Sequence, residues 1–168
     1  SADGEDNERF SLRKPDWFAD NEIELVDGCR VTAVHPDARQ VETASGERIS
    51  YDRLVLAMGA TPRRLPAADD LDGVFELRHP DDAARLRSAA AKASSAIIIG
   101  GGYIGLEVAA TLAKSGKDVT VIEAAPRLLA RVASPAISAF FADLHADAGT
   151  TVITDAGVED IAANHGGF

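Results

Sequence analysis

The stretch Ile97-Ile98-Ile99-Gly100-Gly101-Gly102-Tyr103-Ile104-Gly105 decides the fold of this chain of 168 residues. Three β-branched residues predict a buried strand, and the glycines after it fit the pattern G-x-G-x-x-G at the start of a helix. Gly100 permits a tight turn, Gly102 lets a pyrophosphate approach the backbone, and Gly105 lets the helix pack closely on the strand. The phosphates would meet unpaired N–H groups at the helix N-terminus. The stretch therefore predicts a dinucleotide-binding turn.

A carboxylate follows at the distance that such a turn requires. Glu123 ends the next expected strand, 123 − 105 = 18 residues after Gly105. An acid at this place can accept hydrogen bonds from the ribose diol of the adenosine, and it repels a 2′-phosphate. We therefore expect NADH to be favoured over NADPH, although Arg127 and Arg131 lie close by in the sequence and could attract a phosphate.

Two further side chains could face the ligand from the helix that follows the turn. Tyr103 and Glu107 are four residues apart, so they share a face near the N-terminal end, within reach of a nicotinamide. Apolar residues occupy almost every other side of this helix. We therefore expect Glu107 to be buried, and a buried acid needs a partner, either a ligand or a basic side chain.

The rest of the chain divides into two halves at residues 62–73, which are rich in proline, glycine and charge. The first half predicts a short helix at residues 15–20. It then predicts strands at residues 23–26, 29–34, 39–43, 48–51 and 54–57. Turn residues join the three runs between 29 and 51, which favours an antiparallel meander. The second half predicts helices at residues 80–93, 103–115 and 135–146, which alternate with strands at residues 96–99, 118–123 and 150–154. This alternation indicates an α/β fold with a parallel sheet, and we expect domains at 1–62 and 63–168.

Composition excludes several functional classes. Hydrophobic residues make up 46% and charged residues 26% of the chain, which is typical of a folded globular protein. The net charge of −10 would repel nucleic acid, and one cysteine leaves neither a disulfide nor a CxxC pair. The four histidines have no metal-ligand spacing, and no Ser-His-Asp set supports hydrolysis. The most apolar stretch contains four glycines and Glu107, so we expect no membrane span and a cytoplasmic protein.

Longer segments resemble one enzyme family. The segment IIIGGGYIGLEVAATLAKSGKDVTVIEAAPRLLARVASPAISAFFADLHADAG is similar to the NADH-binding segment of FAD-dependent ferredoxin and rubredoxin reductases, within the pyridine nucleotide-disulfide oxidoreductases. Upstream, ISYDRLVLAMGATPRRLP resembles the strand that bears the Ala-Thr-Gly motif of the family, and FELRHPDDAARL resembles its Leu-Arg-Thr segment. Together these segments extend the resemblance over residues 10–158.

The resemblance implies a Rossmann-like sheet of an NADH-binding domain, joined to a partial, β-rich piece of an FAD-binding domain. Family members pass a hydride from NADH to FAD, and then single electrons to an iron-sulfur or rubredoxin partner. By resemblance Tyr103 would cover the flavin until NADH displaces it, Glu107 would lie beside the nicotinamide, and Arg131 would contact the adenosine part. No protein acid is needed for hydride transfer, so the resemblance implies no catalytic residue. The positions that match those lining FAD are Val31, Ala57, Gly59 and Arg78.

The chain also departs from the family pattern. Met58 and His79 replace two threonines, which removes two hydroxyls from the expected flavin site. The FAD fingerprint and the downstream parts of both domains are missing, so we expect an internal fragment that self-associates and holds no FAD alone. Two alternatives stay open. One is an NADH oxidase or coenzyme A-disulfide reductase with a reactive cysteine upstream, and the other is a non-catalytic NADH-binding module.

Overall fold

The computed structural model describes residues 12–62, 65, 68 and 71–162. The chain divides into two compact units, Ser1–Ala60 and Thr61–Phe168, two residues before the boundary expected from the sequence (62 − 60 = 2). Parts of the expected linker, the first eleven residues and the C-terminal Asn164-His165-Gly166-Gly167 lie outside the described residues. The two units are described separately below.

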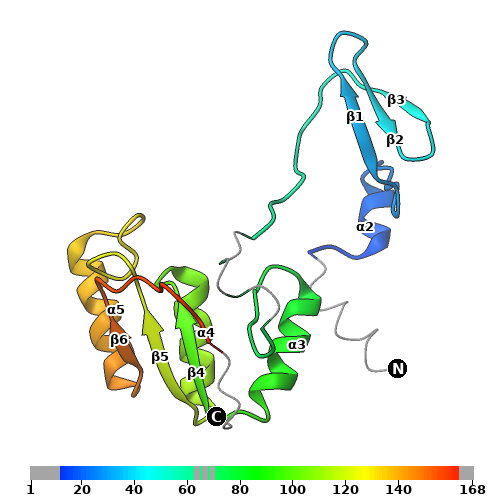
Figure 1. Ribbon diagram of the computed structural model, residues 1–168. Coiled ribbons are helices and arrows are strands. Elements are labelled where there is room, and N and C mark those ends of the chain that lie inside the picture. The colour runs from blue at the N-terminus through cyan, green and yellow to red at the C-terminus, as the bar shows by residue number, and fades with distance from the viewer. Residues whose placement is uncertain (1–11, 63–64, 66–67, 69–70, 163–168) are drawn as a thin grey trace. The chain divides into compact units, whose positions relative to one another are not determined.

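In its described residues, 12–60, the first unit contains one short helix and a three-stranded sheet (Figure 1). Its elements are α2 (Pro15–Asp20), β1 (Val31–His35), β2 (Gln40–Thr43) and β3 (Arg48–Ser50). Pro15 starts α2 because its fixed φ suits a first helical position and its missing N–H costs nothing there. The strands pair in the order β1-β2-β3, both pairs antiparallel. The predicted helix and the predicted meander are therefore confirmed.

Two predicted strands of the first unit are wrong. Residues 23–26 and 54–57 are not in strands, and no described residue pairs with them in a sheet. Their apolar side chains stay in solvent, with Val26 53% and Val55 85% exposed. A strand forms only where a neighbour accepts and donates its backbone hydrogen bonds. The apolar, β-branched composition of these runs is therefore insufficient by itself.

The second unit has an α/β fold, as the alternating segments predict. Its strands β4 (Ser95–Ile99), β5 (Asp118–Ile122) and β6 (Thr151–Ile153) pair in the order β4-β5-β6, all parallel. The α-helices among the described residues of this unit are α3 (Pro80–Ala90), α4 (Tyr103–Lys114) and α5 (Pro135–Asp147). None of the helices in the described part of the chain has the length and apolar character needed to cross a membrane.

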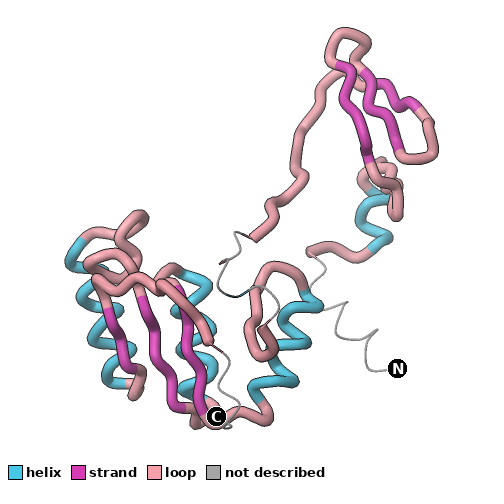
Figure 2. Tube along the Cα trace, viewed as in Figure 1, coloured by secondary structure: helices cyan, strands magenta, loops and turns pink. Residues whose placement is uncertain are grey.

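The core of the second unit lies on one face of the parallel sheet. In the register of the strands Ile98, Val121 and Val152 are neighbours, and all three pack in or against the core. Helices α4 and α5 cover this face (Figure 2), and their contribution to the core includes Leu106, Ala109, Leu112, Phe141 and Ala142. Side chains alternate along a strand, so the other face carries Ile97, which is 69% exposed, with Ile99 and Ile153, each 43% exposed.

Candidate functional site

The glycine turn between β4 and α4 has the geometry that its sequence pattern requires. Gly100 has φ +110°, which only glycine adopts easily. A Cβ on Gly105 would collide with the carbonyl oxygen of Gly100, so the helix lies directly on the turn. A Cβ on Gly102 would meet nothing within 4 Å, which leaves its surroundings open to a ligand. The turn is thus tight inside and open outside.

The N-terminus of α4 offers backbone donors beside this open position. Gly102 is the N-cap, and the first bond of the helix runs from the N–H of Leu106 to the oxygen of Gly102. By helix geometry the N–H groups of residues 103–105 have no acceptor within the helix. Its first turn contains no acid, so no charge of the helix's own competes with an anion there. This end of α4 can therefore accept phosphate oxygens.

Glu123 lies against the glycine turn, as its spacing from Gly105 predicts. Its Oε2 accepts a hydrogen bond from the N–H of Gly101 at 2.6 Å, and its Oε1 accepts one from the N–H of Ala125 at 2.8 Å. The two bonds fix the carboxylate at the carboxyl end of β5. A carboxylate has about four lone-pair sites, so each oxygen keeps one for a further donor such as a ribose hydroxyl.

Leu128 packs against the glycine turn beside Glu123, and sequence reasoning missed it. A Cβ on Gly101 would lie 2.5 Å from Cδ2 of Leu128 and 3.2 Å from Cβ of Glu123. Leu128 is 1% exposed, and the next residue, Leu129, donates its N–H to the oxygen of Gly101 at 2.9 Å. The loop of residues 123–134 therefore closes directly onto the glycine turn. The apolar pair 128–129 was its only sequence signal.

Arg127 points into this loop. Its Nη1 donates to the carbonyl oxygen of Ala133 at 2.9 Å and to Oγ of Ser138 at 2.7 Å, and its Nη2 donates to the oxygen of Ala130 at 2.9 Å. The Ser138 hydroxyl in turn donates to the oxygen of Leu128 at 2.6 Å. From the sequence, Arg127 could have attracted a 2′-phosphate and so weakened the preference for NADH, but its guanidinium donates to these three oxygens of the protein instead. Arg131 is exposed.

Leu129 holds an unusual backbone conformation in the same loop. Its φ is +54°, a left-handed value that costs a non-glycine residue about 1–3 kcal/mol. Its oxygen accepts the N–H groups of Val132 and Ala133, both at 3.0 Å. The side chain is 3% exposed and belongs to the core. These contacts hold a conformation that the backbone would not adopt alone.

Tyr103 and Glu107 lie on the face of α4 that the sheet leaves uncovered. Tyr103 is 56% exposed, and Glu107 is exposed as well. The expectation that Glu107 is buried and needs a partner is therefore wrong. Helix α4 buries only the face formed by Leu106, Ala109 and Leu112, so its apolar residues continue onto a solvent face, where Ile104 is 55% exposed. An open aromatic and an open acid thus flank the glycine turn.

The residues that resemble the flavin-lining positions lie in both units. Val31 is in β1, and Ala57 and Gly59 are in the extended segment after the meander, where Gly59 has φ +71°. Met58, which replaces a threonine of the family pattern, is 83% exposed. Arg78 belongs to the second unit, whereas the other three residues belong to the first. A flavin site at these residues stays a prediction.

Asp82 organises the segment that carries Arg78. Its Oδ2 accepts the N–H groups of His79 at 2.8 Å and Arg78 at 2.9 Å, and its Oδ1 accepts Nη2 of Arg85 at 2.6 Å. The hydrogen bond from the His79 backbone, with those from Arg85 and the Arg78 backbone, lowers the pKa of Asp82 to about 2. The carboxylate thus fixes the start of α3.

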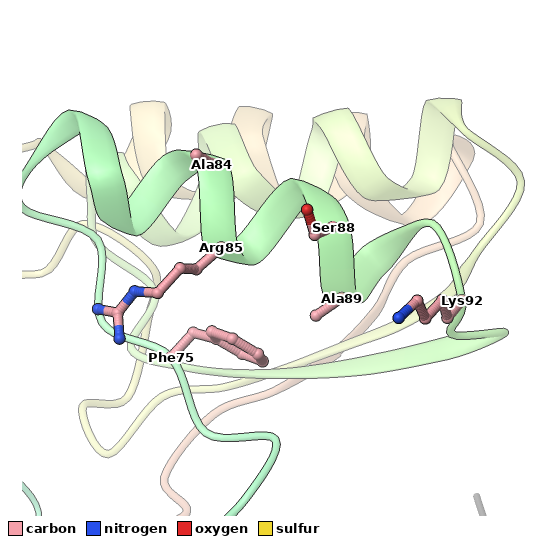
Figure 3. Close-up of a pocket in the computed structure, with 6 residues that line it drawn as sticks. All are labelled: Phe75, Ala84, Arg85, Ser88, Ala89 and Lys92. Carbon is pink, nitrogen blue, oxygen red and sulfur yellow. The ribbon is translucent and has the colours of Figure 1, made fainter. Parts of the chain in front are cut away.

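An open pocket of about 490 Å³ lies along α3 (Figure 3). The ring of Phe75 lies between the charged ends of two basic side chains, and none of the residues predicted for a cofactor lines this pocket. The lining residues are Phe75, Ala84, Arg85, Ser88, Ala89 and Lys92. The pocket is therefore separate from the glycine turn.

Comparison with known proteins gives the family of the chain. The family model described as pyridine nucleotide-disulphide oxidoreductase matches residues 3–167. The chain belongs to this family. Among oxidoreductases of this family, putidaredoxin reductase of Pseudomonas putida is 43% identical over 151 residues, which are 88% of this chain and 36% of that protein. Rhodocoxin reductase of Rhodococcus erythropolis is 41% identical over 162 residues, which are 96% of this chain and 38% of that protein.

A solved structure of this family gives the same result. The chain matches the reductase in the crystal structure of the covalent putidaredoxin reductase–putidaredoxin complex with a TM-score of 0.83 and 40% identity. The match covers 95% of this chain and 39% of that one. The chain therefore spans little more than a third of the length of these oxidoreductases.

Proposed function

We propose that this chain forms the NADH-binding part, and an adjoining piece of the FAD-binding part, of an NADH-dependent ferredoxin or rubredoxin reductase. The observation that carries the proposal is the fixed carboxylate of Glu123, which lies against Gly101 at the open N-terminus of α4. This arrangement combines an anion-binding helix end with an acceptor for a ribose diol. Residues 63–168 would bind NADH, and residues 1–62 would belong to the FAD-binding domain.

Each element of the site has a separate role in this proposal. The N–H groups of residues 103–105 would bind the pyrophosphate, Glu123 would bind the adenosine ribose, and Arg131 would contact the adenosine part. Tyr103 and Glu107, exposed on the uncovered face of α4, would lie beside the nicotinamide. FAD, when bound, would accept a hydride and release electrons singly. The contribution of the protein is the placement of the reacting rings and the charge around them.

The charge at Glu123 supports NADH as the coenzyme. A 2′-phosphate would meet a carboxylate held in place by two backbone N–H groups. The negative charges of the phosphate and the carboxylate would repel each other, and the repulsion is stronger where the site is partly shielded from water. The guanidinium of Arg127, which could offset this repulsion, is occupied by the oxygens of Ala130, Ala133 and Ser138.

The electron acceptor we propose is a ferredoxin or a rubredoxin. Two of the relatives are reductases named for putidaredoxin and rhodocoxin, and a solved relative is joined to putidaredoxin. We also propose that the chain self-associates, because the open sheet face carries the exposed apolar side chains of Ile97, Ile99 and Ile153. Sedimentation showing a stable monomer at high concentration would contradict self-association. A cytoplasmic location also stays a prediction.

Calorimetric titration of the chain with NADH tests the proposed function. We expect saturable binding to the wild type and none to Gly102→Val, because the new side chain would occupy the path of the pyrophosphate. Circular dichroism serves as the control for folding, since the space around Gly102 is open. Equal affinity in the two proteins would refute the site.

Absorbance and turnover separate the alternatives. We expect the purified chain to be colourless and to show weak or no turnover, and bound flavin in the purified material would refute that expectation. A chain that binds NADH but reduces no acceptor, even when FAD is added, would favour a binding module. NADH-dependent reduction of coenzyme A disulfide would favour the alternative of an NADH oxidase or coenzyme A-disulfide reductase.

A further inference from the structure

We propose that Arg127 is a positioning residue whose internal hydrogen bonds set the preference of the site for NADH over NADPH. The inference rests on the proposed function, because it concerns how the same site selects its coenzyme. Arg127 itself would touch no part of the nucleotide. It would act by fixing the loop of residues 123–134, which carries Glu123 at its start and closes on the glycine turn.

The guanidinium of Arg127 is bound to its own loop and to the first turn of α5. Three hydrogen bonds between 2.7 and 2.9 Å link it to the oxygens of Ala130, Ala133 and Ser138. A guanidinium donates through a rigid planar fork, so these contacts fix the loop and the start of α5 together. The same contacts direct the half-buried Arg127 cation towards protein oxygens, which leaves it less able to attract a 2′-phosphate.

The contacts continue from Arg127 to the glycine turn. Ser138, 3% exposed, accepts from Arg127 and donates to the oxygen of Leu128 at 2.6 Å. The side chain of Leu128 lies directly over Gly101, whose N–H is the donor to Glu123. A continuous series of contacts therefore joins Arg127, Ser138, Leu128, Gly101 and the selecting carboxylate.

The left-handed residue Leu129 explains why the loop needs this support. Its φ of +54° is unfavourable for leucine, yet the conformation is required for its N–H to reach the oxygen of Gly101 at 2.9 Å. Arg127 bonds to the oxygens of Ala130 and Ala133, on the C-terminal side of Leu129. Without these bonds the loop can relax towards an ordinary conformation and move away from the turn.

Loss of the loop geometry would change selectivity as well as affinity. A fixed Glu123 both accepts from a ribose hydroxyl and repels a 2′-phosphate at the same point. A mobile Glu123 would do both less well, so NADH would lose affinity while NADPH would lose less or gain. A purely structural role for Arg127 predicts a different result, in which the two affinities fall together.

The test compares the affinities of NADH and NADPH for variants of the full chain. Calorimetry gives both dissociation constants, and thermal unfolding reports the stability of each variant. For Arg127→Met we expect about a tenfold loss of NADH affinity and at least about a threefold fall in the NADH/NADPH preference. Ser138→Ala should shift the preference in the same direction by a smaller factor, and it decides the question if Arg127→Met does not fold. Lys114→Met, at the far end of α4, is the matched control and should leave both constants unchanged.

The outcomes separate this inference from the proposed function. If the wild type binds neither coenzyme, the proposed function fails and this inference fails with it. If the wild type prefers NADH and both variants keep its preference ratio, Arg127 has no positioning role, while the NADH site itself stands. An unchanged ratio accompanied by a lower melting temperature would identify Arg127 as purely structural and would overturn the inference.

Discussion

The N–H of Gly101 donates to Oε2 of Glu123 over 2.6 Å and so joins the loops that follow two neighbouring parallel strands. Gly101 follows β4 and Glu123 follows β5, so both lie at the carboxyl edge of the sheet, where ligands bind in open α/β folds. The bond makes the anion-binding turn and the ribose acceptor one unit. A change in either residue should therefore affect both the stability of the protein and its affinity for NADH.

Replacement of Glu123 by glutamine tests this relationship. The amide keeps one acceptor oxygen but turns an NH₂ group towards the N–H of either Gly101 or Ala125. We expect the free energy of unfolding to fall by about 1–2 kcal/mol and NADH affinity to fall as well. Denaturant unfolding and calorimetry measure the two effects. The exposed Glu159→Gln is the matched control. Wild-type stability and affinity in Glu123→Gln would show that the hydrogen bonds of the Glu123 carboxylate contribute to neither property.

Alanine at Gly101 should mainly reduce stability, whereas alanine at Gly102 should mainly reduce NADH affinity. Because a Cβ on Gly101 would lie 2.5 Å from Leu128, we expect Gly101→Ala to destabilise the protein by about 1–3 kcal/mol. Gly102 has open space around it, so Gly102→Ala should change stability by less than about 0.5 kcal/mol while weakening NADH binding. Thermal unfolding and calorimetry separate the two effects. Equal loss of stability in both variants would contradict this assignment.

Thr150 carries a polar atom that the fold does not use. Its side-chain oxygen is buried and finds no partner in the described part of the chain, and the residue is 4% exposed. Valine has the same shape without the hydroxyl, so we expect Thr150→Val to stabilise the second unit by about 1 kcal/mol. Circular dichroism during denaturation measures the change.

Thr43 provides the matched control for Thr150. It is equally buried, at 2% exposed, but its hydroxyl lies 2.8 Å from that of Ser45. Thr43→Val should therefore destabilise the first unit by about 1 kcal/mol. The fluorescence of Trp17 during denaturation measures this change. The idea about Thr150 fails if both valine variants are destabilised alike.

His145 should make the second unit sensitive to acid. Burial lowers the pKa of this side chain, and its Nδ1 has no hydrogen-bond partner among the described residues. The unfolded chain then binds a proton more readily than the folded one, so stability is full above the ordinary pKa of about 6.5 and falls as the pH drops below it. We expect His145→Met to lose less stability between about pH 7 and pH 5 than the wild type. Identical pH profiles from thermal unfolding would exclude His145 as the cause.

The local signals of the sequence were sufficient for most of the fold. The β4-α4-β5 segment was predicted to within a residue at each end, because β-branched strands, glycines and an apolar helix repeat all favoured the same elements. Residues 54–57 were predicted wrongly as a strand for the opposite reason. Strand formation depends on a partner that is distant in sequence, and no local pattern reports whether that partner is present.

The site was predictable only where its spacing is regular. The distance from Gly105 to Glu123 follows from one helix and one strand, so the carboxylate could be placed beside the turn before the structure was known. The inward position of Arg127 could not, because it depends on acceptor oxygens of Ala130, Ala133 and Ser138 whose placement no sequence pattern indicates. Glu107 was expected to be buried because the composition of α4 does not show how much of the helix the sheet covers.

Helix α4, with only 12 residues, serves two independent purposes on its two sides. Leu106, Ala109 and Leu112 support the sheet, while Tyr103, Ile104 and Glu107 face outwards beside the turn. Substitutions on the outward side can therefore alter which nucleotide or ring is accepted without weakening the scaffold. Mutational tolerance along this helix should follow a period of three to four residues, so that ligand recognition can diversify while the architecture is retained.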